Sequence, residues 1–210
     1  MVPALFALII VIILFSVILH EVMHGYMALR FGDHTAEYAG RLTLNPLPHI
    51  DPIGTVLLPL LLIITGSPVL FGWAKPVPVN PYNFRDLRKG EFFVSIAGIL
   101  ANLGLALLAA LLFHLALPSD NSLILNALGF AVDINLILAV FNLIPIPPLD
   151  GSKIVLSFLP PKLAIQFQQI ERYGLFILLF LLLIPVGRTT IIGFLLGQVL
   201  QFAHLVLGIQ

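Results

Sequence analysis

The chain opens with an apolar stretch in which no charged residue occurs between Val2 and Leu19. At 1.5 Å per helical residue, such a stretch is long enough to cross the ~30 Å hydrocarbon core of a bilayer. Backbone N–H and C=O groups find no partner in lipid, so a chain that crosses a membrane must do so as helices or as a closed barrel. We therefore expect a first membrane-spanning helix over residues 3–31, ended by Gly32 and Asp33.

The composition extends this expectation to the whole chain. Hydrophobic residues make up 60% of it and charged residues 10%, whereas a typical soluble domain is about 25% charged. We predict an all-α integral membrane protein formed by a single domain over residues 1–210. The net charge of zero gives no reason to expect a nucleic-acid partner, and the bilayer is the expected surroundings. With no cysteine, any metal site must use histidine and carboxylate ligands.

Apolar runs and polar breaks predict about five membrane spans and one irregular region. After the first span, residues 33–81 form a β and re-entrant region, in which 33–51 are expected to form short strands and a turn. A strand edge there could bind an unwound peptide, or the segment could be an ordinary surface loop; both alternatives stay open. The later spans are expected at the following ranges: 92–117, 123–144, 164–186 and 189–207.

The basic residues decide the orientation. Segment 52–73 is apolar but interrupted by proline and glycine, so it either crosses the membrane or enters and returns on one side. If it returns, nine of the ten Lys and Arg residues lie on one face and only Arg188 lies on the other. The positive-inside rule then places that face in the cytoplasm. The expected topology, in the cell membrane, has the N-terminus outside and the C-terminus in the cytoplasm.

A metal-binding motif lies near the cytoplasmic end of the first span. His20, Glu21 and His24 form an H-E-x-x-H pentad, and helical positions four apart share a face, so both imidazoles can reach one ion. Two imidazoles and a neighbouring carboxylate base are the components of zinc-dependent hydrolysis. Ionisable groups inside a membrane helix are costly, which makes a purely structural pair of histidines less favoured here.

A zinc hydrolase needs a third protein ligand. His34, His49, His114, His204 and several carboxylates are candidates. We prefer Asp150, because it follows an apolar span in a proline-rich segment and because the expected topology places it at the depth of His24.

The two motifs together resemble the site-2 protease family of intramembrane zinc metalloproteases. The likeness rests on His20-Glu21-x-x-His24 and on the segment 142–151, Asn-Leu-Ile-Pro-Ile-Pro-Pro-Leu-Asp-Gly, and it extends to Gly72-Trp73-Ala74-Lys75-Pro76 and other short segments. One departure is Ile99, where many members have proline after Ala-Gly. The chain looks like a minimal-core member without PDZ or CBS domains.

The resemblance implies a function and a role for each motif residue. It implies one Zn²⁺ held by His20, His24 and Asp150, with Glu21 as the catalytic base and Asn142 steadying the oxyanion or the substrate. The implied reaction is hydrolysis of peptide bonds in or near transmembrane segments of protein substrates, as in regulated intramembrane proteolysis. The alternative is a metal-ion or proton-coupled membrane transporter, which would show internal repeats; the sequence contains none.

Overall fold

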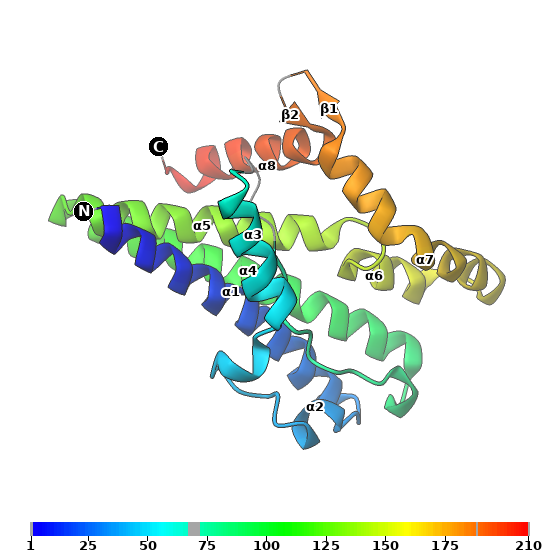
Figure 1. Cartoon of the computed structure of the whole chain (residues 1–210). Coiled ribbons are helices and arrows are strands. Elements are labelled where there is room, and N and C mark those ends of the chain that lie inside the picture. The colour runs from blue at the N-terminus through cyan, green and yellow to red at the C-terminus, as the bar shows by residue number, and fades with distance from the viewer. Residues whose placement is uncertain (1, 67–71, 188, 210) are drawn as a thin grey trace.

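The computed structural model describes residues 2–66, 72–187 and 189–209, and its centre is a group of three long apolar helices. These are α1 (Val2–Arg30), α4 (Leu87–Ala116) and α5 (Ser122–Leu143), which pack side by side (Figure 1). In the described part of the chain, these three are long and apolar enough to span a membrane. The prediction of an all-α membrane protein is therefore confirmed, although these helices are fewer than the five spans expected.

Polar side chains define where α4 and α5 begin. The carboxylate of Asp86 accepts a hydrogen bond from the Lys89 N–H, and the Asn121 side chain accepts from the N–H groups of Leu123 and Ile124. Such caps satisfy backbone donors that the first helical turn leaves without partners. A 3₁₀ turn, η4 (Leu117–Ser119), joins the two helices and makes them antiparallel neighbours.

The prediction of strands in residues 33–51 is wrong. The described structure has a single helical turn there, α2 (Thr35–Tyr38), followed by the 3₁₀ turn η1 (Leu47–His49). The reason is local: the Asp33 carboxylate accepts hydrogen bonds from the backbone N–H and the hydroxyl of Thr35, which starts a turn instead of an extended strand.

The next segment leaves the side of α1 near Leu14 and Ile18 and returns to the same place. It comprises the π-helical turn η2 (Pro52–Leu57) and α3 (Leu58–Ile64). The Trp73 N–H donates to the Gly54 carbonyl over 3.1 Å, and the Thr55 hydroxyl donates to the Trp73 carbonyl over 2.8 Å. Its two ends are therefore adjacent, as a re-entrant path requires. Residues 67–71 lie outside the described residues.

An extended segment, residues 72–80, then passes the end of α1 and leads through η3 (Pro81–Asn83) into α4. The Lys75 N–H donates to the His49 carbonyl, and the buried Arg41 side chain donates to the Lys75 carbonyl. At the far end of the segment, the Asn80 N–H donates to the Asp33 carboxylate. These contacts fix the segment beside α1.

The C-terminal third differs from the predicted spans. It contains α6 (Asp150–Phe158), α7 (Pro161–Leu183), the paired two-residue strands β1 (Pro185–Val186) and β2 (Thr189–Thr190), and α8 (Ile191–Leu207). Leu178 of α7 packs with Leu149 and with Ile192 of α8, all at the C-terminal end of α5. The crossing predicted over 164–186 is not among the helices long and apolar enough to span a membrane in the described structure: α7 packs at that end of the bundle, and α8 runs back along α5 (Figure 1).

The path of α8 also corrects the expected position of the C-terminus. His114, in the last turn of α4, bonds through Nε2 to the Leu207 carbonyl over 2.6 Å, and Ile209 packs against Ala109 and Val132. Figure 1 shows residues 207–209 at the same end of the bundle as the start of α1. The two ends of the chain thus lie at one end of the fold and not at opposite ends. Arg188, used in the orientation argument, lies outside the described residues.

Candidate metal centre

The two histidines of the pentad point their rings into one buried space. His20 and His24 lie one turn apart on α1, both are buried, and their Nε2 atoms are 2.9 Å apart. The ring planes are nearly perpendicular, at 89°. The helical spacing anticipated from the sequence is therefore realised.

The hydrogen bonds behind the rings determine which nitrogens face each other. His20 Nδ1 lies 2.6 Å from Asn102 Oδ1, and His24 Nδ1 lies 2.7 Å from the Val94 carbonyl oxygen. The Asn102 side chain donates its amide N–H groups to the Ser16 carbonyl and to Asn135 Oδ1. Its amide oxygen is therefore the atom that accepts the hydrogen bond from His20. Both Nδ1 atoms must therefore donate, and both Nε2 atoms of the neutral imidazoles carry lone pairs.

Asp150 completes a group of three ligand atoms. Its Oδ2 lies 3.2 Å from His20 Nε2 and 3.2 Å from His24 Nε2. The carboxylate is buried, and Oδ2 has no hydrogen-bond partner. Asp150 is the first residue of α6, and the turn that follows α5 brings it to the depth of the two imidazoles.

The arrangement fits a metal ion. Three electron-pair donors converge on one point with no proton between them, which is unfavourable unless a cation occupies the centre. Tetrahedral Zn²⁺ with bonds of about 2.0 Å separates its ligand atoms by about 3.3 Å. The observed separations of 2.9, 3.2 and 3.2 Å are close to that value. The ligand set of two imidazoles and one carboxylate is also one that zinc hydrolases use.

Glu21 lies beside these atoms and is held in place by the backbone. Its carboxylate lies within 4.8 Å of the ligand nitrogens of His20 and His24. The Val77 N–H donates to Glu21 Oε2 over 2.8 Å. The extended segment 72–80 therefore orients Glu21, a contribution that no sequence pattern indicated because it comes from a backbone group.

Asn142 is not joined to the metal centre by a hydrogen bond in the described structure. Its side-chain amide donates to the Leu138 carbonyl of its own helix over 3.0 Å. The polar residues that do bond to the centre are Asn102 and, behind it, Asn135, which also binds the Ser16 hydroxyl. The sequence already offers Asn102 as an amide inside the predicted span 92–117, at a position that matches the resemblance to the site-2 protease family.

The other candidate ligands lie elsewhere. His49 is buried and bonds through Nε2 to the Thr43 carbonyl, so it belongs to the packing of the 41–49 loop. The remaining histidines have partners away from the centre: His34 with Glu37, His114 with the Leu207 carbonyl, and His204 with Asp133.

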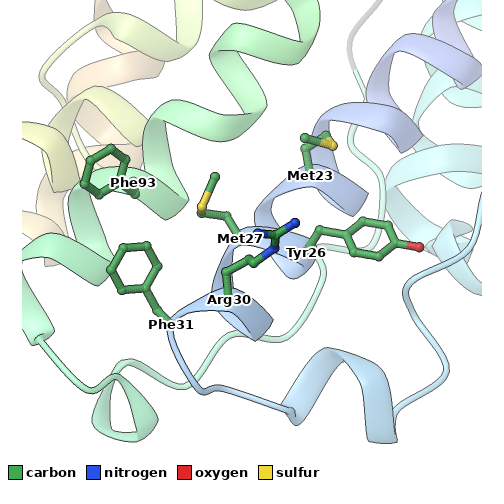
Figure 2. A pocket seen from close by; sticks show the side chains of 6 residues that line it. All are labelled: Met23, Tyr26, Met27, Arg30, Phe31 and Phe93. Atoms are coloured by element: carbon green, nitrogen blue, oxygen red, sulfur yellow. The ribbon is translucent and has the colours of Figure 1, made fainter.

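A separate apolar groove lies between α1 and the start of α4. It has a volume of about 670 Å³, and Figure 2 shows its lining side chains from both helices. The lining residues are Met23, Tyr26, Met27, Arg30, Phe31 and Phe93. None of the metal-centre residues lines this groove.

Comparison with known proteins shows which family the chain resembles. The sequence model described as "Peptidase family M50" matches residues 117–185. "Putative zinc metalloprotease YwhC" of Bacillus subtilis is 38% identical over 185 residues, which cover 85% of this chain and 81% of that protein. "Putative zinc metalloprotease Rip2" of Mycobacterium tuberculosis is 34% identical over 172 residues, 82% of this chain and 65% of that protein. "Putative zinc metalloprotease MJ0611" of Methanocaldococcus jannaschii is 29% identical over 66% of this chain and 63% of that protein. No solved structure matches the chain.

Proposed function

Because the chain belongs to peptidase family M50 and is a zinc metalloprotease, we propose that it hydrolyses peptide bonds in or near transmembrane segments of membrane proteins. The observation that carries the proposal is the convergence of His20, His24 and Asp150, with Glu21 beside them, inside a bundle of apolar helices. The depth of this site favours a substrate that is itself in the membrane. The transporter alternative is not favoured by the family.

We propose that His20 Nε2, His24 Nε2 and an Asp150 oxygen hold one Zn²⁺ per chain. Zinc, when bound, supplies Lewis acidity that polarises a carbonyl and acidifies a water molecule. The chain's own contribution is to present three correctly oriented ligands. Asn102 and the Val94 carbonyl hold the two imidazoles in the tautomer that leaves Nε2 free.

Glu21 is the proposed proton carrier. Its carboxylate is close enough to the ligand atoms to accept a proton from an attacking water and to return it to the amine of the departing peptide. The Val77 N–H binds Oε2, which leaves Oε1 for this exchange. Asn142, on the last turn of α5, is proposed to donate to the developing oxyanion after releasing the Leu138 carbonyl.

We further propose that the metal centre lies near the cytoplasmic face. The described basic residues belong to segments that gather at the end of the bundle where α1 ends and α4 begins, and the positive-inside rule assigns that end to the cytoplasm. The adjacent ends of segment 52–73 support a re-entrant path on this side. Water would reach the centre from this face.

The direct test is cleavage of a model transmembrane substrate by the purified chain in liposomes. The wild-type protein should cleave it, and 1,10-phenanthroline should stop the reaction by removing the metal. Glu21→Gln should slow cleavage at least ~10²-fold, because the amide cannot accept the proton, while the zinc content stays unchanged. Equal cleavage by Glu21→Gln, or metal flux without cleavage, would overturn the proposal.

A further inference from the structure

One residue of α4 lies directly against the metal-facing edges of both imidazoles and has no side chain. A Cβ added to Gly98 would lie 2.6 Å from three ring atoms, namely His20 Cε1, His24 Cε1 and His24 Nε2. Carbon atoms in ordinary contact are about 3.5–4.0 Å apart, so these distances are far inside contact. The rings can occupy their positions only because residue 98 is glycine.

The neighbours of Gly98 on α4 explain why the rings cannot simply move aside. Val94, Gly98 and Asn102 are four residues apart and therefore lie on one face of the helix. Val94 and Asn102 hold the Nδ1 atoms of His24 and His20, one turn to each side of Gly98. The rings are thus fixed at their back edges, and a methyl group at position 98 would press on their front edges.

We propose that Gly98 is a positioning residue of the metal centre, which sets the spacing of the two Nε2 atoms relative to Asp150. This inference rests on the zinc site of the proposed function and adds a residue that supplies no ligand atom. A methyl group at position 98 moves His24 Nε2 away from the point that all three ligands share. The expected consequence is weaker metal binding with a distorted ligand geometry.

The chain offers two glycines on the same helix as matched controls. Gly104 has no heavy atom within 4 Å of an added Cβ, so Gly104→Ala tests the general effect of alanine in α4. Gly90 would place a Cβ 2.4 Å from Phe84, with no atom of His20 or His24 among its three nearest neighbours, so Gly90→Ala tests a packing clash that does not press on the imidazoles. Alanine has the higher helix propensity, and it favours the helix equally at all three positions.

The experiment measures Zn²⁺ affinity by chelator competition, the absorption spectrum of bound Co²⁺, and the thermal stability of the metal-free protein. All variants are full-length proteins in detergent. Gly98→Ala should bind Zn²⁺ at least about tenfold more weakly and give an altered Co²⁺ spectrum, as expected when a group that sets the orientation of metal ligands is changed. Gly104→Ala should match the wild type, and Gly90→Ala should lower metal-free stability while keeping the wild-type affinity and spectrum.

Two results would overturn the inference. One is wild-type Zn²⁺ affinity and Co²⁺ spectrum in Gly98→Ala. The other is a loss of affinity in Gly90→Ala as large as that in Gly98→Ala, which would make the effect one of packing. Failure of the proposed zinc site gives a different result, since the wild-type protein itself would then bind no Zn²⁺, and failure of the proposed proteolysis alone would appear as zinc binding without substrate cleavage.

Discussion

At the scale of single residues, the metal centre depends on groups that are not themselves ligands. His20 and His24 can direct Nε2 inward because Asn102 and the Val94 carbonyl occupy Nδ1. A metal ligand whose second ring nitrogen is bound in this way has a fixed tautomer and a fixed ring orientation. The buried Asn102 amide in α4 is therefore as much a part of the site as the H-E-x-x-H pentad in α1.

Replacing this amide should weaken the site measurably. Asn102→Ala removes the acceptor for His20 Nδ1, and we expect Zn²⁺ affinity to fall about 10- to 100-fold. Chelator competition measures the change. Asn135→Ala is the matched control, because it disturbs the same buried network without touching either histidine. Equal affinities in Asn102→Ala and the wild type would show that His20 does not depend on this bond.

At the scale of elements, Asp33 joins the end of α1 to the far end of segment 72–80 and to η3, just before α4. Its carboxylate accepts hydrogen bonds from Thr35, from the Asn80 N–H and from the Asn83 side chain. Burial alone would raise the pKa of this carboxyl, but the four hydrogen bonds from these three residues outweigh it and hold the pKa below its ordinary value. The ionised form is therefore the one that stabilises the fold.

The pH dependence of this contribution has a definite sign. The pKa of Asp33 is lower in the folded state than in the unfolded state. The stabilisation is therefore complete when the pH is above the pKa of the unfolded state, and it is lost as the pH falls through the pKa of the folded state. We expect Asp33→Asn to lower the free energy of unfolding at pH 7 by about 1–3 kcal/mol. The difference from wild type should shrink below about pH 4, as thermal unfolding at several pH values would show.

The control is Asp86→Asn, which alters an exposed carboxylate at the start of α4. We expect a smaller effect there because water replaces the lost contacts. A constant difference between Asp33→Asn and wild type from pH 3 to pH 7 would contradict the role given to the ionised carboxylate.

Some elements could be predicted from sequence and others could not. Uncharged runs predicted α1, α4 and α5. The H-E-x-x-H spacing indicated His20, Glu21 and His24, and the expected topology favoured Asp150. The strands expected in 33–51 failed because one carboxylate, Asp33, selects a turn, which is a local hydrogen-bond preference that alternation patterns do not record. Two features of the site could not be predicted from sequence. The Val77 N–H that holds Glu21 is a backbone group, which any residue would supply, and the lack of space at Gly98 depends on how α1 and α4 pack.

At the scale of the whole molecule, α7 shows why the number of apolar runs in a sequence does not determine the path of the chain. Its second half is apolar enough to suggest a span, but Gly174 allows the helix to approach Pro147 so closely that an added Cβ would lie 2.1 Å from the Pro147 carbonyl oxygen. This contact holds α7 at the Asp150 end of the bundle. The chain then returns once, through α8, so its two ends lie together.

This arrangement predicts that both ends of the chain face the same compartment. Epitope tags placed at each end should be digested together by a protease added outside spheroplasts, because we expect the N-terminal end of α1 to be outside. A tag inserted after Gly40, an exposed glycine near the opposite end of α1, should be protected. Digestion of only one of the two end tags would contradict the observed path of α8.

The most direct measurement of the central claim is the zinc content of purified wild-type and Asp150→Ala proteins. We expect one zinc per wild-type chain, and near-complete loss in Asp150→Ala, because the two imidazoles alone leave the site one ligand short. Asp133→Ala is the matched control, since this carboxylate pairs with His204 away from the centre and its loss should leave the zinc content unchanged. One zinc per chain in Asp150→Ala would contradict the claim that α1 and α6 bind one ion together.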